Sequence, residues 1–99
     1  MGEDKGGDEP FAEEDEYLAY LKGERSRYAW VMRAYGGKSQ EEADEAAELF
    51  YAYEPPGPYR GLVFHDEAWH WAMLTLHGHD YVTRLPHLVE PPAEYRALD

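Results

Sequence analysis

Histidines and carboxylates gather in one stretch of the chain, His65 to Asp80, which reads HDEAWHWAMLTLHGHD. This stretch contains four of the five histidines and two of the three tryptophans. Imidazole and carboxylate groups bind iron, manganese and zinc, and they also act as general acids and bases. The stretch is therefore the first place to look for a metal site or for acid–base chemistry.

The sharpest spacing within it is Glu67-Ala68-Trp69-His70. Residues three apart share one face of a helix, and a carboxylate and an imidazole placed in this way occur in carboxylate-bridged di-iron and di-manganese sites. Such sites combine two Glu-x-x-His motifs with two more glutamates from other helices. This chain has one such motif, together with one carboxylate, Glu24, in an otherwise apolar helical seam.

A two-fold homodimer would double both features. In this respect the chain resembles the short ferritin-like proteins that complete a di-iron site only on dimerisation. The resemblance implies iron or manganese held by Glu24, Glu67 and His70 of each chain, with His77 as a further candidate beside the site. The alternative for Glu67 is an exposed position in the first turn of a helix, where acids are favoured.

The other histidines do not complete a known metal motif. His70 and His77 are seven residues apart, so about 10 Å of helix separates their Cα atoms. The H-E-x-x-H motif does not occur, and the absence of cysteine excludes disulfides, thiolate metal sites and cysteine nucleophiles. The sequence therefore predicts either no cofactor or the iron or manganese of a di-metal site.

Other catalytic groups are scarce. The two serines and two threonines stand outside nucleophile motifs such as G-x-S-x-G, and there is no glycine-rich loop to hold a phosphate. No catalytic residue is predicted, and the inventory argues against an enzyme more than for one.

A formal net charge of −12 is the dominant global property of the chain. This charge repels phosphate backbones and anionic lipids, so we expect neither nucleic acid nor a membrane as a partner. No segment approaches the about 18 apolar residues of a membrane-spanning helix, and the N-terminus lacks the features of a secretion signal. We therefore expect a soluble, cytoplasmic protein, and its acidic surface would steer basic partners toward it.

Candidate residues for a protein partner lie on two predicted helices. No Lys or Arg occurs from Ser39 through Tyr59, and the acids of this segment lie opposite its alanines. In the next helix two tryptophans project about 200° apart, so they cannot both face one core. Tryptophan is enriched at binding hot spots. The predicted partner-binding residues are Glu41, Asp44, Glu45, Glu48, Trp69 and Trp71. The alternatives for the acids are pairing with arginines of the first helix and plain solvation, and the alternative for the aromatic residues is a tyrosine-rich core.

The elements that would position these residues are helices. Few β-branched residues and many Ala, Leu and Glu favour helix over strand. We predict an all-α fold of three main helices and a short C-terminal helix, with a homodimeric helical bundle as one arrangement. Residues 1–9 are predicted to be a flexible acidic tail, and residues 10–99 a single helical domain.

Local signals give the expected helix ends. The first helix should begin near Pro10 and end at Gly36-Gly37, unless Gly23 divides it. Its buried seam should contain Tyr17, Leu21, Tyr28, Val31 and Tyr35. The second helix should follow the capping box at residues 39–42 and bury Ala43, Ala46, Ala47, Phe50 and Tyr53. The third should end at Gly78 and begin either near Pro58 or at Asp66, which would then be its N-cap.

Three functional hypotheses follow from the sequence. The leading one is a small acidic interaction module, a regulatory or accessory protein that binds a basic protein partner and is itself a homo-oligomer. The second is the ferritin-like di-metal homodimer. The third is a structural or scaffold protein without small-molecule chemistry.

Overall fold

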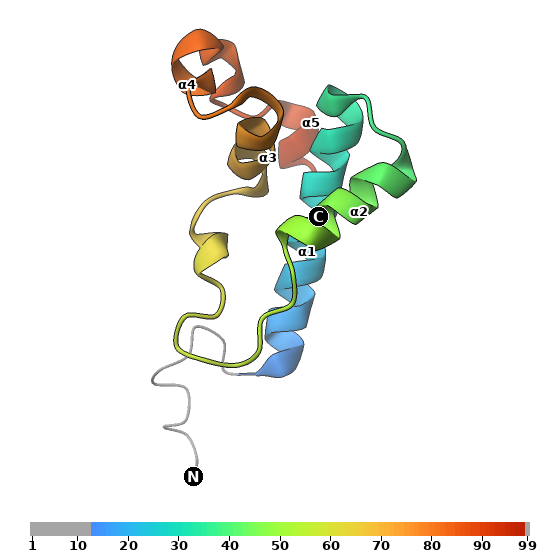
Figure 1. Cartoon of the computed structure of the whole chain (residues 1–99), viewed down its shortest axis with the longest axis vertical. Coiled ribbons are helices and arrows are strands. Elements are labelled where there is room, and N and C mark those ends of the chain that lie inside the picture. The colour runs from blue at the N-terminus through green and yellow to red at the C-terminus, as the bar shows by residue number, and fades with distance from the viewer. Residues whose placement is uncertain (1–12, 99) are drawn as a thin grey trace.

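Every regular element among residues 13–98, the part that the computed structural model describes, is helical (Figure 1). This confirms the predicted all-α class. The α-helices are α1 (Glu14–Gly36), α2 (Gln40–Phe50), α3 (Ala68–His77), α4 (Tyr81–Arg84) and α5 (Ala93–Arg96), and the 3₁₀ helices are η2 (Leu62–His65) and η3 (Pro86–Leu88). The expected tail and the expected helix start at Pro10 lie outside the described residues. None of the helices in the described part has the length and apolarity that crossing a membrane requires.

The long helix α1 is the axis of the fold, and Gly23 does not divide it. Both α2 and α3 pack against α1, and this packing offsets the about 1 kcal/mol that glycine costs inside a helix. Gly37 adopts the left-handed conformation, with a φ of 68°, and its N–H bonds the Met32 carbonyl oxygen, which ends the helix. The predicted seam is buried except at Tyr35, whose ring is 42% exposed.

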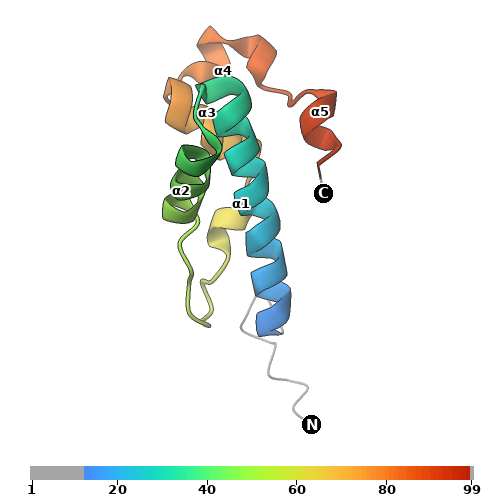
Figure 2. The ribbon, with the colours of Figure 1, turned by 90° about the vertical axis from the view of Figure 1, so that its right-hand side faces the viewer.

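Helix α2 begins at the predicted capping box and runs back beside the C-terminal half of α1 (Figure 2). The Ser39 hydroxyl accepts the Glu42 N–H, and the Glu42 carboxylate accepts the Ser39 N–H. The helix ends at Phe50, where the Arg25 guanidinium donates to the Tyr51 carbonyl oxygen at 2.6 and 3.0 Å. Because the helix stops there, Tyr53 lies outside it and is half exposed, contrary to the expectation of burial.

An extended connector from residue 52 to residue 61 descends beside the N-terminal half of α1 and returns as η2 (Figure 1). Arg60 fastens this connector to α1, since its side chain is buried and its guanidinium lies 4.0 Å from the centre of the Tyr17 ring. The same guanidinium donates to the Glu14 carboxylate at 2.8 Å. A buried arginine therefore holds the connector against the first turn of α1.

Helix α3 begins at Ala68, so both expected starts, Pro58 and Asp66, were wrong. Glu67 is the N-cap residue, and its side chain makes no capping hydrogen bond. After Gly78, the short α4 and η3 turn across the end of the molecule, and α5 returns to α1 (Figures 1 and 2). Gly78 has a φ of 88° and a ψ of 170°, a region that essentially only glycine occupies.

Tyrosine makes up much of the core. Five of the nine tyrosines are buried, and they pack with small and sulfur-containing side chains from α1, α2 and α3. The largest fully buried side chains are Trp69, Tyr17, Tyr51, Tyr81, Met32, Met73 and Val31. This composition supplies core volume in a chain that has no isoleucine and few valines.

Candidate functional site

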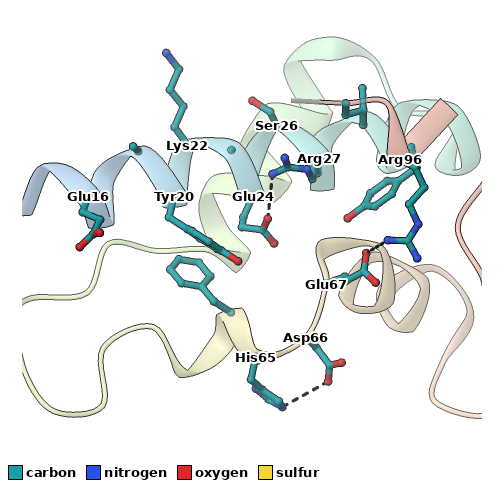
Figure 3. Close-up of a pocket in the computed structure, with 15 residues that line it drawn as sticks. Glu16, Tyr20, Lys22, Glu24, Ser26, Arg27, His65, Asp66, Glu67 and Arg96 are labelled. Carbon is teal, nitrogen blue, oxygen red and sulfur yellow. Dashed lines mark hydrogen bonds and ion pairs between the residues drawn. The ribbon is translucent and has the colours of Figure 1, made fainter. Parts of the chain in front are cut away.

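A groove of about 840 Å³ lies between α1, η2, the start of α3 and α5 (Figure 3). It brings together two of the predicted metal ligands, Glu24 from α1 and Glu67 from the residue before α3. Both side chains point into the groove, and a dashed contact joins each one to an arginine (Figure 3). The groove is therefore a candidate functional site.

Glu24 is 7% exposed, which is rare for a carboxylate. Its Oε2 accepts from the Arg27 guanidinium at 3.1 Å, and the carboxylate also accepts the backbone N–H of Ala68. Burial raises the pKa of Glu24, while Arg27 and the Ala68 N–H act to lower it. Glu24 thus caps α3 from another helix, which explains both the polar residue in the α1 seam and the start of α3 at Ala68.

A second tertiary cap comes from α5. The Trp69 N–H donates to the Tyr95 hydroxyl at 3.1 Å, so the next free N–H of α3 also has a partner from a distant element. Burial raises the pKa of the Tyr95 phenol. Beside it, the Arg96 guanidinium donates to the Glu67 carboxylate at 2.9 Å. The polar groups of the groove therefore serve to join α1, α3 and α5.

The predicted metal ligands are not arranged as a metal site in this chain. Glu67 has an extended backbone and is the N-cap residue, so it stands just before the first turn of α3 rather than within the helix. The His70 Nδ1 lies 2.8 Å from the Tyr81 hydroxyl, and His77 lines a different hollow beside Tyr35. Between residues 13 and 98, no three His, Asp or Glu side chains are grouped closely enough to hold a metal ion.

The acids of α2 are exposed, and two of them, Asp44 and Glu48, line a hollow between α2 and α1 together with Lys22 and Arg25. Glu41, Asp44, Glu45 and Glu48 are all exposed, and no ion pair from the described residues reaches any of them. Asp44 only accepts from the Gln40 amide at 2.7 Å. Two of the three arginines of α1 have other partners, since Arg25 bonds the Tyr51 carbonyl oxygen and Arg27 bonds Glu24. The α2 acids therefore make no direct ion pair with the arginines of α1 in the described part of the chain.

The two tryptophans of α3 have different environments. Trp69 is 2% exposed, and its indole N–H donates to the Leu88 carbonyl oxygen at 2.7 Å, so its prediction as a partner-binding surface residue was wrong. Trp71 is half-buried, and its indole N–H donates to the Val63 carbonyl oxygen at 2.8 Å. The Trp71 ring lies 5.6 Å from the Phe50 ring, at the border between α3 and α2.

Sequence reasoning missed three residues that shape these sites. Tyr95 and Arg60 gave no signal, because their partners are far away in the chain. Tyr51 was also missed: its hydroxyl is buried, and no hydrogen-bond partner for it is present within residues 13–98. Burial raises the pKa of the Tyr51 phenol strongly, and the negative charge of Glu24 adds to this effect.

Comparisons of this chain with protein-family models, with curated proteins and with solved structures found no match.

Proposed function

We propose that this protein is an interaction module that binds a basic protein segment on the exposed surface of α2. We call this surface the α2 acidic face; it comprises Glu41, Asp44, Glu45, Glu48 and Leu49. The observation that carries the proposal is the unpaired state of these acids within the described structure. Exposed charges without internal partners remain available to an external one.

Four carboxylates outside α2 each have an arginine partner at 3.1 Å or less: Glu14 with Arg60, Glu24 with Arg27, Glu67 with Arg96, and Asp80 with Arg84. Asp15 and Glu16 at the start of α1 are exposed and make no ion pair with another described residue, as is the case for the acids of α2. The chain thus uses four of its arginines on acids outside α2. The α2 acidic face keeps its full negative charge, which favours fast association with a positively charged segment.

Leu49 adds an apolar contact to this charged surface. It is 77% exposed, and it lies one helical turn after Glu45 on the same side of α2. Phe50 and Trp71, both half-buried, lie at the border between α2 and α3. A partner segment that alternates Lys or Arg with an apolar side chain would match this arrangement, with the charges steering encounter and the apolar contacts slowing dissociation.

Affinity capture with a charge-reversed variant tests this proposal. Wild-type protein and a Glu45→Lys/Glu48→Lys variant would be immobilised in equal amounts, exposed to lysate of the source cells, and washed at low and at moderate salt. We expect a salt-sensitive basic protein on the wild type, and its loss on the variant. A Glu13→Lys/Asp15→Lys variant is the matched control, because it makes the same charge change at exposed residues at the start of α1.

Circular dichroism of all three proteins would show whether the helices are retained. If the same proteins bind to the wild type and to the α2 variant, the proposal is wrong. Retention on the wild type and equal loss on both variants would also contradict it, because net charge rather than the α2 acidic face would then be responsible.

A further inference from the structure

A second hollow, of about 520 Å³, lies at the end of the molecule where α1 stops, between its last turn, α3 and η3. This volume is within the range of about 300–1,000 Å³ that is typical of small-molecule sites. Its lining is mainly apolar, formed by Trp69, Leu85 and Leu88, with the exposed Tyr35 ring at one side. It does not overlap the α2 acidic face, and the inference below is independent of the proposed function.

The wall opposite α1 is held in place by hydrogen bonds to α3. The Trp69 indole donates to the Leu88 carbonyl oxygen, and the Arg84 guanidinium donates to the His77 carbonyl oxygen at 2.6 Å. The Trp69 and Tyr35 rings meet edge to face, at 86° and 5.1 Å between centroids. These contacts bury the Trp69 ring and fix the position of the Tyr35 ring, so the surface open to a planar ring is that of Tyr35, Leu85 and Leu88.

The polar side chains that line this hollow have few partners among the described residues. The Glu90 side chain is 87% exposed, and its one ion pair in the described structure is a long contact of 4.0 Å to Arg96. No hydrogen bond from residues 13–98 reaches the ring nitrogens of His77 or His87, which also line the hollow. Glu90 therefore gives the rim a negative charge, and the two imidazoles offer hydrogen bonds.

We propose that this hollow binds a small aromatic amine. The ring would lie against Tyr35, Leu85 and Leu88, and the ammonium group would pair with the Glu90 carboxylate, with an imidazole of His77 or His87 within reach of a ring substituent. The charge complementarity is both local and global, because the net charge of −12 attracts a cation and repels a carboxylate ligand of the same shape.

Heteronuclear NMR on the indole N–H groups tests this inference directly. The three tryptophans give separate indole signals, which Trp30→Phe and Trp71→Phe variants would assign. Titration with tryptamine should shift the Trp69 signal, and indole-3-acetate should bind at least several-fold more weakly. No shift of the Trp69 signal up to millimolar tryptamine would overturn the proposal, and so would equal binding of indole-3-acetate.

The role of Glu90 has a matched test. Glu90→Gln should weaken tryptamine binding about two- to fivefold, the range of a surface ion pair. Glu94→Gln removes the same charge from an exposed residue outside the lining and should leave the affinity unchanged. Uncharged 3-methylindole should bind both variants equally. Equal tryptamine affinity for the two variants would refute the assignment of the ammonium group to Glu90.

Discussion

Glu24 provides the most detailed prediction, because its carboxylate lies on a buried boundary between α1 and α3. Replacing it by alanine leaves the N–H of Ala68, a fully buried residue, without its acceptor. An unsatisfied buried donor costs about 1–3 kcal/mol. Glu24→Ala should therefore reduce the free energy of unfolding by that amount, which lowers the melting temperature of a domain of this size by about 4–8 °C per kcal/mol.

Glu24→Gln is the matched variant, because the amide keeps an acceptor oxygen for Ala68 and loses only the charge. We expect it to cost less than about 1 kcal/mol, since the partly exposed Arg27 can be solvated in its place. Urea unfolding followed by tryptophan fluorescence measures both variants. If Gln destabilised the protein as much as Ala does, the capping role assigned to Glu24 would be refuted.

The stability difference between wild type and Glu24→Gln should also depend on pH, in a direction that the pKa of Glu24 determines. Burial raises the pKa of Glu24 in the folded state above its value in the unfolded chain, so the folded state binds this proton more readily. The contribution of this group to stability is therefore full below the unfolded pKa and falls as the pH rises through the folded pKa. Glu24→Gln lacks this loss, so its stability relative to wild type should improve as the pH rises from about 4 toward neutrality. A trend in the opposite direction would show that the pKa is lowered.

Three further substitutions test how the elements are joined. Arg60→Ala removes the buried guanidinium from the Tyr17 ring and should cost about 1–3 kcal/mol in thermal unfolding, whereas Arg33→Ala, at an exposed position, should change stability by less than about 0.5 kcal/mol. Tyr95→Phe removes the acceptor of the Trp69 N–H and should cost about 1 kcal/mol, with faster hydrogen exchange at the start of α3. Ser39→Ala breaks the capping box and should lower the free energy of unfolding by about 1 kcal/mol, measured in denaturant melts. An unchanged helix content together with an unchanged unfolding midpoint would contradict this prediction.

The parts of the fold that sequence could predict are those with local causes. The capping box at Ser39 and the end of α1 at Gly36 and Gly37 depend on residues within a few positions, and both were found where the sequence placed them. The start of α3 could not be found in this way, because its caps come from Glu24 and Tyr95 on other helices. The local candidate, Asp66, is therefore not used as a cap.

The same distinction between local and distant causes applies to the candidate site. A period of 3.6 residues places Trp69 and Trp71 on different faces of a helix, but it does not indicate which face the core covers. That choice depends on η3, which supplies the carbonyl oxygen for the Trp69 indole. Similarly, an isolated glutamate in an apolar seam is compatible with a ligand or a cap, and only the position of Ala68 beside it distinguishes the two. The exposed acids of α2 were predictable because their segment contains no base.

The association rate of the captured partner at different ionic strengths tests the central claim most directly. Wild-type protein, the Glu45→Lys/Glu48→Lys variant and the Glu13→Lys/Asp15→Lys control would each be measured by biolayer interferometry from low to physiological salt. We predict that the rate falls steeply with salt for the wild type and the control, and that it is low and nearly independent of salt for the α2 variant. The same salt dependence in all three proteins would contradict the assignment of partner binding to the α2 acidic face.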